Sequence, residues 1–319
     1  MAITQHMLHA LEMGIDTHQE PIAYVRKDCH ICRSEGFVAN TRVLLCSGEI
    51  ELIATLNVVQ NEKLPINVIG LSDIAYKRLQ CSSNQEISIS HAPVVASMSL
   101  VRKKIYGKAL TRRDMTKIVE DISKHNYSDI EIASFLSACA GKRMTELEIV
   151  YLTKAMVATG RKLTWGASNK VFDKHCIGGL PGNRTTPIVV SIVSASGLLI
   201  PKTSSRAITS PAGTADMMES LANVNLDISE IKHVVAKTGA CLVWGGAVNL
   251  SPADDMLIRI ERALDIDGEG QLIASVLSKK IAAGSTHVVI DIPVGETAKV
   301  RSEKSAQRLS KLFTSVGKA

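Results

Sequence analysis

The feature that most constrains the fold is a glycine-rich segment at residues 174–183, with the sequence KHCIGGLPGN. It follows a short extended run at residues 170–173 and precedes an apolar stretch that has the composition of a helix. The backbone N–H groups of such a turn can converge on an oxyanion, and the start of the helix adds a partial positive charge. Because Lys174 and His175 stand at the entrance of the turn, we expect chemistry on a phosphate group there.

The overall composition is that of an ordinary globular protein. Of the 319 residues, 45% are hydrophobic and 21% are charged, and the net charge of +6 is compatible with an anionic substrate. Aromatic residues make up only 3%, which argues against nucleic-acid binding by base stacking. The longest apolar stretch, residues 187–199, is too short to span a membrane. We therefore expect no nucleic-acid or membrane partner.

The cysteine content indicates a reducing compartment. Seven cysteines are spread along a chain with no secretory signal, and free thiols in the cytoplasm are the simplest account. Cys29 and Cys32 form a lone CxxC pair, which without a second pair is weak evidence for zinc. Nothing in the sequence places this pair at a helix start that would favour a redox role. We expect no metal site.

Residues 1–95 predict a small β-rich domain. Segments with strand composition lie at residues 43–45, 50–56 and 87–90, and the start of the chain at residues 5–13 is more helix-like.

Residues 111–160 predict a compact helical unit. Thr111, Ser128 and Thr145 each stand three residues before an acidic residue, at the start of an apolar-periodic run, which is the pattern of a capping box. Gly141 and Gly160 provide helix ends.

From residue 171 onward, strands and helices are expected to alternate. The near-continuous apolar runs at residues 240–244 and 287–292 predict buried strands, because parallel strands are covered on both faces. Together with the strand before the glycine-rich turn they make only three, so the sheet is expected to be thin and incomplete. Helices are expected at residues 189–196, from 251, at 271–283 and from 302.

Two further groups could carry chemistry. The run at residues 201–214 combines hydroxyl side chains with a lysine and an arginine, which suit a phosphate. Ser275 and Lys279 share one face of a predicted helix. Taken alone, the first group is better explained as a solvated loop, and the second is compatible with an exposed polar face on which Lys280 is one more surface charge.

Four motifs, in this order, resemble one family. They are RKKxxGxxLT at residues 102–111, DKHxxGGxPGN at 173–183, PKTSSRAITS followed by AGT within 201–214, and ASxLxKK at 274–280. In these motifs the chain resembles the thymidine/pyrimidine-nucleoside phosphorylases, and within them the branch that includes the archaeal AMP phosphorylases. The resemblance extends from about residue 100 to the end of the chain.

The resemblance implies an α/β fold class in three parts. A β-rich N-terminal domain spans residues 1–95, a helical domain spans 100–166 with 250–285, and an α/β phosphate-binding domain spans 167–249 with 286–319. The active site would lie in the cleft between the last two, and a homodimer would form through the helical domain. Because family members continue well past the end of this chain, we expect an incomplete sheet and weak or no turnover.

The resemblance also implies roles for individual residues. Phosphate, a co-substrate, would be held by Lys174, Thr186, Ser204, Thr214 and by Cys176, which stands where the family usually has a serine. The base or nucleotide would be bound by Gly179, Ser205, Arg206, Ser210, Arg259, Ser275, Lys279 and Lys299. His175 and Asp267 would be catalytic, with Asp267 as the proton donor. No cofactor and no metal are implied.

The activity implied is phosphorolysis, in which thymidine and phosphate give thymine and deoxyribose 1-phosphate. One alternative is phosphorolysis of AMP or another nucleoside 5′-monophosphate to the base and ribose 1,5-bisphosphate, which the hydroxyl-rich run at residues 203–210 favours. A second is an anthranilate phosphoribosyltransferase, which would need acidic ligands for magnesium diphosphate that the sequence does not offer. A third is a non-catalytic, truncated subunit.

Overall fold

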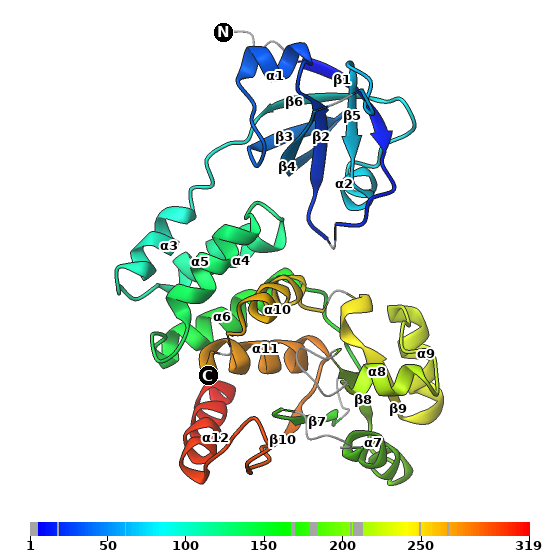
Figure 1. The fold of residues 1–319 in the computed structure, drawn as a ribbon. Helices are drawn as coiled ribbons and strands as arrows, with labels where there is room; N and C mark the ends of the chain where they lie inside the picture. The colour runs from blue at the N-terminus through cyan, green and yellow to red at the C-terminus, as the bar shows by residue number, and fades with distance from the viewer. Residues whose placement is uncertain are drawn as a thin grey trace. The chain divides into compact units, whose positions relative to one another are not determined.

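The protein is described by a computed structural model that covers most of the chain. The described residues are 6–17, 19–60, 62–166, 170–178, 184–204, 206, 213–248, 250–266 and 268–319. The chain divides into two compact units, Met1–Val95 and Ala96–Ala319, whose elements are labelled in Figure 1. Among the described helices, none is both long and apolar enough to cross a membrane.

The first unit is a closed β-barrel with the strand order β1-β5-β2-β4-β3-β6. Strand β1 pairs with β5 in parallel and with β6 in antiparallel orientation, which closes the barrel. The predicted strand segments fall within β3, β4 and β6. The elements are β1 (His6–Glu12), β2 (Ile22–Arg26), α1 (His30–Glu35), β3 (Arg42–Ser47), β4 (Ile50–Val59), β5 (Val68–Leu71), α2 (Asp73–Arg78) and β6 (Glu86–His91).

The expectation of a helix at residues 5–13 is wrong, because this segment forms strand β1. Leu8 and Ala10 are buried in the barrel core, whereas Leu11 is exposed. The segment takes the extended form because it is hydrogen-bonded between β5 and β6, which lie far along the chain. A local pattern carries no information about such partners.

The CxxC pair belongs to the core of the barrel. The pair does lie at a helix start, which the sequence did not indicate: Cys29 is the N-cap residue of α1 and Cys32 lies within the helix. Both side chains are buried. Burial, with a smaller contribution from Cys29, raises the pKa of Cys32 to about 11. The Cys32 thiol therefore stays protonated at neutral pH, as a packing residue does.

The second unit begins with a helix that was not predicted, α3 (Met98–Ile105), and continues with the three predicted helices. These are α4 (Arg112–Ser123), α5 (Asp129–Cys139) and α6 (Glu146–Thr159). The last three each begin with a complete capping box, made by Thr111, Ser128 and Thr145 with the acidic residue three positions later. The sequence prediction of these three helix starts is confirmed.

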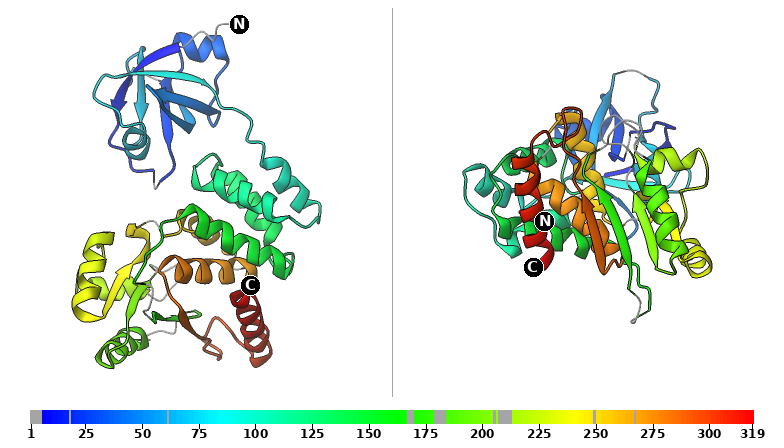
Figure 2. Two further views of the ribbon diagram at one scale, coloured as in Figure 1. Left: turned by 180° about the vertical axis from the view of Figure 1, so that it is seen from behind. Right: turned by 90° about the horizontal axis from the view of Figure 1, so that it is seen from below.

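Two later helices pack onto this group. Helix α11 (Glu269–Ala282) lies along α6 in the front and back views (Figure 1, Figure 2), and α10 (Pro252–Leu264) contacts α4, α5 and α6. The backbone of Gly160 passes so close to Leu250 that a Cβ would stand 2.0 Å from its carbonyl oxygen. Only glycine permits this approach at the end of α6. Helix α12 (Glu303–Lys318) packs on α6 and α11.

The remaining strands form a splayed parallel arrangement. Strand β10 (His287–Asp291) pairs with β7 (Phe172–Cys176), and β8 (Ile200–Ser204) pairs with β9 (Ala240–Trp244). A parallel bridge between Val171 and Leu199 joins the two pairs at their amino ends. Helices α7 (Thr185–Ala195), α8 (Thr214–Glu219) and α9 (Ile228–Thr238) cover β8 and β9, and a 3-10 turn (Gly245–Val248) follows β9.

The expectations for this sheet need two corrections. Strand β8 was not predicted, because its polar residues suggested a loop. Lys202 and Thr203 are nevertheless buried. The buried charge of Lys202 has a partner in the interior, the carboxylate of Asp173. Strand β10 was expected to be buried, but Val289 is 65% exposed. Among the described residues β10 pairs with β7 alone, which leaves its other edge open.

Candidate active site

The predicted phosphate residues gather at the carboxyl ends of adjacent parallel strands. Lys174, His175 and Cys176 are the last three residues of β7, and Ser204 is the last residue of β8. Val171 and Leu199 pair in parallel, and Cys176 and Ser204 each lie five residues beyond this pair, so the two residues stand at the same edge. Open α/β sheets bind ligands at this edge, where loops and helix starts converge.

Thr186 and Thr214 lie in the first turns of helices that follow these strands. Thr186 is the second residue of α7 and is buried, and Thr214 is the first residue of α8. A hydroxyl in the first turn stands near the positive end of the helix, where an anion is favoured. Their roles in binding phosphate remain predictions.

A buried cluster of charges lies behind this edge. The carboxylate of Asp173 is 2.8 Å from the ammonium group of Lys280 and 3.9 Å from that of Lys202. It also accepts hydrogen bonds from the Ser285 hydroxyl at 3.2 Å and from the backbone N–H of Lys174 at 2.7 Å. Asp173, Lys202 and Lys280 are each 3% exposed. Lys280, which the sequence alone could equally have left on the surface, is thus an interior residue.

Lys174 is held across the pair of strands β7 and β10. Its ammonium group lies 3.1 Å from the carboxylate of Asp291, and the lysine is buried. Two residues beyond β7, Gly178 has a φ of +79°, and a Cβ there would stand 2.4 Å from the Cβ of Lys299. Glycine at this position therefore lets Lys299 pack against the start of the glycine-rich turn.

His175 is kept in its neutral form. It is partly buried, and burial is the main reason that its pKa lies well below the usual value. Four positive charges lower the pKa further, because they disfavour a second cation nearby. These charges belong to Lys280, Lys202, Lys279 and Lys174. At neutral pH the imidazole therefore acts as a hydrogen-bonding group.

The predicted base-binding residues Ser275 and Lys279 are organised by an aspartate that the sequence reading did not single out. The carboxylate of Asp254, which is 1% exposed, accepts a hydrogen bond from Ser275 at 3.1 Å and forms an ion pair with Lys279. The ammonium group of Lys279 also reaches the Ser275 hydroxyl at 3.3 Å. Burial alone would lower the pKa of Lys279, but Asp254 and Asp255 more than offset this, so the lysine remains charged.

The two predicted arginines are engaged elsewhere in this structure. Arg259 on α10 makes a two-point contact with Asp129 at the start of α5, with one N–O distance of 2.7 Å. Arg206 makes two hydrogen bonds to Glu219, at 2.7 and 2.8 Å, and stacks over the ring of Trp244. Their assignment to the base or nucleotide remains a prediction.

Four predicted site residues lie outside the described residues: Gly179, Ser205, Ser210 and Asp267. Within the described ranges, histidine, cysteine and acidic side chains form no group of three or more that could hold a metal ion.

The sequence reading missed the residues that support the site from behind. Asp173, Lys202 and Lys280 carry charge in motifs that were recognised, but no pattern indicated that they face one another. Asp254 was hidden in the first turn of a helix, where an acidic residue is expected for capping reasons alone. An acidic residue in the first turn of a helix is too common to indicate a role in a functional site.

Two family profiles match the chain. One, described as "Glycosyl transferase family, helical bundle domain", matches residues 98–160, and the other, "Glycosyl transferase family, a/b domain", matches residues 168–315. A solved structure, anthranilate phosphoribosyltransferase from Thermus thermophilus, superposes with a TM-score of 0.53 over 68% of this chain and 63% of its own, at 18% identity. At that identity the likeness concerns the fold alone.

Several relatives are more similar in sequence. A protein of Polaromonas sp. named "Putative thymidine phosphorylase" is 54% identical over 99% of this chain and 62% of its own length. "Putative thymidine phosphorylase 1" from Acidovorax sp. is 57% identical over 98% and 61%, and a "Putative thymidine phosphorylase" from Hahella chejuensis is 56% identical over 93% and 59%. This chain thus spans about three fifths of these relatives. The two domain profiles together match residues 98–160 and 168–315, and the second includes Lys174 and His175. The chain therefore belongs to this glycosyl transferase family.

Proposed function

We propose that the protein transfers a pentosyl group from a pyrimidine nucleoside to phosphate, so that thymidine and phosphate give thymine and deoxyribose 1-phosphate. The observation that carries this proposal is the placement of Lys174, His175 and Ser204 at the carboxyl ends of adjacent parallel strands, next to the buried lysines that face Asp173. An interior group of lysines suits a phosphate, and the relatives named for thymidine phosphorylase support the choice of reaction. No cofactor is proposed, since phosphate itself is the second substrate.

On the phosphate side, the chain's task is to hold the nucleophile in line. Lys174 at the end of β7, with Ser204, Thr186 and Thr214 at neighbouring ends, would fix the oxygens of phosphate beneath C1′ of the sugar. Holding two reactants in a productive orientation removes much of the entropic barrier. Cys176 would contribute less, because a thiol is a weak hydrogen-bond donor.

On the base side, the C1′–N bond breaks as negative charge develops on the pyrimidine. Lys279, kept charged by Asp254, would stabilise that charge, and Ser275 would orient the base. His175 would donate a hydrogen bond from a neutral imidazole, because its lowered pKa leaves it without a transferable proton at neutral pH. Asp267 is proposed as the proton donor.

The test is phosphate-dependent release of base from a panel of thymidine, uridine, AMP and CMP. Release from thymidine or uridine supports the nucleoside reaction, and release from the monophosphates alone favours the nucleotide alternative. Because turnover by this chain is expected to be weak, release is measured at high enzyme concentration over long incubations. Phosphate binding without any release under these conditions would support a non-catalytic subunit and refute the enzymatic proposal. Base release that is equally fast without phosphate would refute phosphorolysis.

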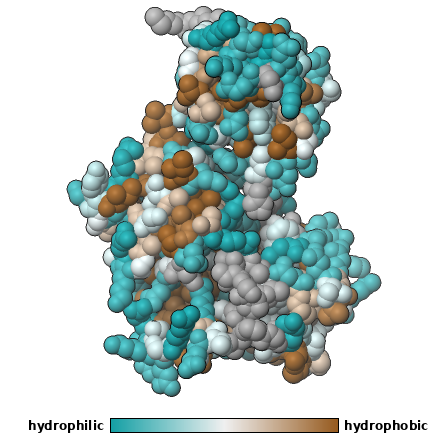
Figure 3. Space-filling view, in the orientation of Figure 1, coloured by the Kyte–Doolittle hydropathy of each residue, from teal (hydrophilic) through white to brown (hydrophobic). Residues whose placement is uncertain are grey.

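We also propose a homodimer through the helices at the start of the second unit. Ile105 is 52% exposed, Tyr106 81% and Ile130 80%, and hydrophobic residues gather on this part of the surface in Figure 3. These exposed side chains, at the end of α3 and on α5, would be covered by a second copy. Light scattering after size exclusion should give twice the chain mass, and Tyr106→Glu should reduce it to one. A monomeric wild-type chain would refute the dimer.

A further inference from the structure

The charges around Asp173 do not balance. Two buried ammonium groups, those of Lys202 and Lys280, face the single carboxylate of Asp173 at 3.9 and 2.8 Å. Both lysines also donate to the same carbonyl oxygen, that of Thr203. Lys174 does not relieve the imbalance, because it already faces Asp291 and adds a positive charge of its own.

An uncompensated charge in a protein interior is costly, and the chain has two ways to remove it. One lysine can lose its proton, or an anion can bind close by. Lys202 is the lysine placed to lose a proton, because it is farther from the Asp173 carboxylate than Lys280 is. The edge above the cluster, which carries Lys174, His175 and Ser204, is where an anion can approach.

We propose that Lys202 is a further residue of the phosphate site, whose side chain takes up a proton from the solvent when an oxyanion binds beside Lys174. The bound oxyanion supplies the negative charge that the cluster lacks, so that Lys202 becomes an ammonium ion in the occupied site. This inference rests on the proposed function for the identity of the anion as phosphate. The proton balance is one proton gained from buffer for each anion bound.

The surroundings of Lys202 support this assignment. Burial lowers the pKa of Lys202 to about 7, the charge of Lys280 lowers it as well, and Asp173 partly offsets both. In the empty site the side chain is therefore mostly a neutral amine at pH 8 and mostly an ammonium ion at pH 6. The titratable groups near it are Asp173, Lys174 and His175 on β7, Lys280 on α11, and Cys241 on β9.

His175 could also take up a proton when an anion binds. The pH dependence of the proton uptake distinguishes Lys202 from His175. Lys202 is already protonated at pH 6, so its uptake should vanish there and approach one proton at pH 8 to 9. His175 has a pKa well below its usual value, so any uptake by His175 should grow as the pH falls. The two residues thus predict opposite trends.

The experiment is isothermal titration of the 319-residue chain with sulfate in pairs of buffers that differ in ionisation enthalpy. Sulfate does not titrate between pH 6 and 9, so any proton taken up goes to the protein. We expect more than half a proton per sulfate at pH 8 and almost none at pH 6. Inorganic phosphate should then displace sulfate from the same site.

Two substitutions sharpen the result. Lys202→Met removes the amine and leaves an unbranched apolar side chain that is one heavy atom shorter. It should abolish the uptake at pH 8 and weaken sulfate binding at pH 7 on the order of tenfold or more. Lys108→Met is the matched control, because it removes the same charge from an exposed position. The control should bind sulfate within about twofold of the wild type, with the proton uptake unchanged.

The outcomes separate this inference from the proposed function. Sulfate binding without proton uptake at pH 8 would overturn the role of Lys202 and leave the phosphate site standing. Uptake that grows towards pH 6 would assign it to His175 and would likewise overturn the inference. No binding of either anion would overturn the phosphate site itself, and the role of Lys202 with it. The wild-type titrations decide the matter even if Lys202→Met fails to fold.

Discussion

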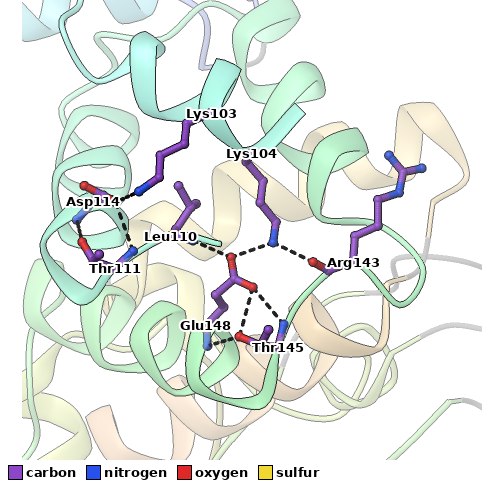
Figure 4. Close-up of polar contacts among 8 residues, drawn as sticks. All are labelled: Lys103, Lys104, Leu110, Thr111, Asp114, Arg143, Thr145 and Glu148. Atoms are coloured by element: carbon purple, nitrogen blue, oxygen red, sulfur yellow. Dashed lines mark hydrogen bonds and ion pairs between the residues drawn. The ribbon is translucent and has the colours of Figure 1, made fainter. Parts of the chain in front are cut away.

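Replacing Glu148 with alanine should destabilise the second unit far more than removing an ordinary helix cap. Glu148 is 1% exposed and its carboxylate lies 2.6 Å from the ammonium group of Lys104, which is 4% exposed. It also accepts hydrogen bonds from the backbone N–H of Leu110 and Thr145, both at 2.8 Å, and Lys104 in turn donates to the carbonyl of Arg143 at 2.6 Å (Figure 4). The helices α3 and α6 and two loops are tied together at this one carboxylate.

The magnitude follows from what alanine would leave behind. The Lys104 ammonium would remain buried without its carboxylate, and breaking a buried ion pair by removing one partner costs about 3–5 kcal/mol. Loss of the capping box adds about 1 kcal/mol. Glu131→Ala is the matched control, because Glu131 occupies the same capping-box position in α5, where its carboxylate accepts hydrogen bonds from the backbone N–H and the hydroxyl of Ser128. It should cost only about 1 kcal/mol.

Unfolding in guanidinium chloride, followed by tryptophan fluorescence, measures this difference. Trp165 and Trp244, the two tryptophans of the chain, both lie in the second unit, so the signal does not report on the barrel. Burial alone would raise the pKa of Glu148, but Lys104 and the backbone donors outweigh it and the net pKa is lowered. The stabilisation by Glu148 is therefore present at neutral pH and is lost as the pH falls through this lowered pKa. The free energies of unfolding of Glu148→Ala and Glu131→Ala should therefore become similar in acid.

A double replacement tests the physical reason. Lys104→Met combined with Glu148→Leu removes both charges and fills the space with apolar atoms, so it should recover much of the stability lost in Glu148→Ala. If Glu148→Ala costs no more than Glu131→Ala at pH 7, the buried pair contributes nothing and the reasoning fails.

Three further predictions concern the site. Asp254→Asn should lower the rate of base release on the order of tenfold or more, because Lys279 loses the carboxylate that positions it; kinetics that match the wild type would exclude this role. Cys176→Ser should tighten phosphate binding in a titration, since a hydroxyl is the stronger donor, and weaker binding would contradict it. Lys202→Met should raise the melting temperature most at or below pH 7, because the folded-state pKa of Lys202 lies below its unfolded value; the gain should shrink towards pH 10, and a gain that is constant with pH would refute this.

Elements that are specified by interactions within a few residues were predicted correctly, and elements that depend on distant parts of the chain were not. The starts of α4, α5 and α6 could be predicted because a capping box and an apolar period are complete within a few residues. The start of the chain was misjudged as helical, and β8 was missed. Both are strands whose partners lie elsewhere in the chain.

For the candidate site, local sequence patterns were enough to indicate the residues that carry the chemistry: the Lys174–His175 pair at a glycine-rich turn for the phosphate, and Ser275 and Lys279 on one helix face for the base. The tertiary structure alone decided how these residues are charged and held. The partners of Lys202, Lys279 and Lys280 are Asp173 and Asp254, which come from other elements. A protonation state depends on the distance to other charges and to water, and that distance is fixed only when separate segments pack together.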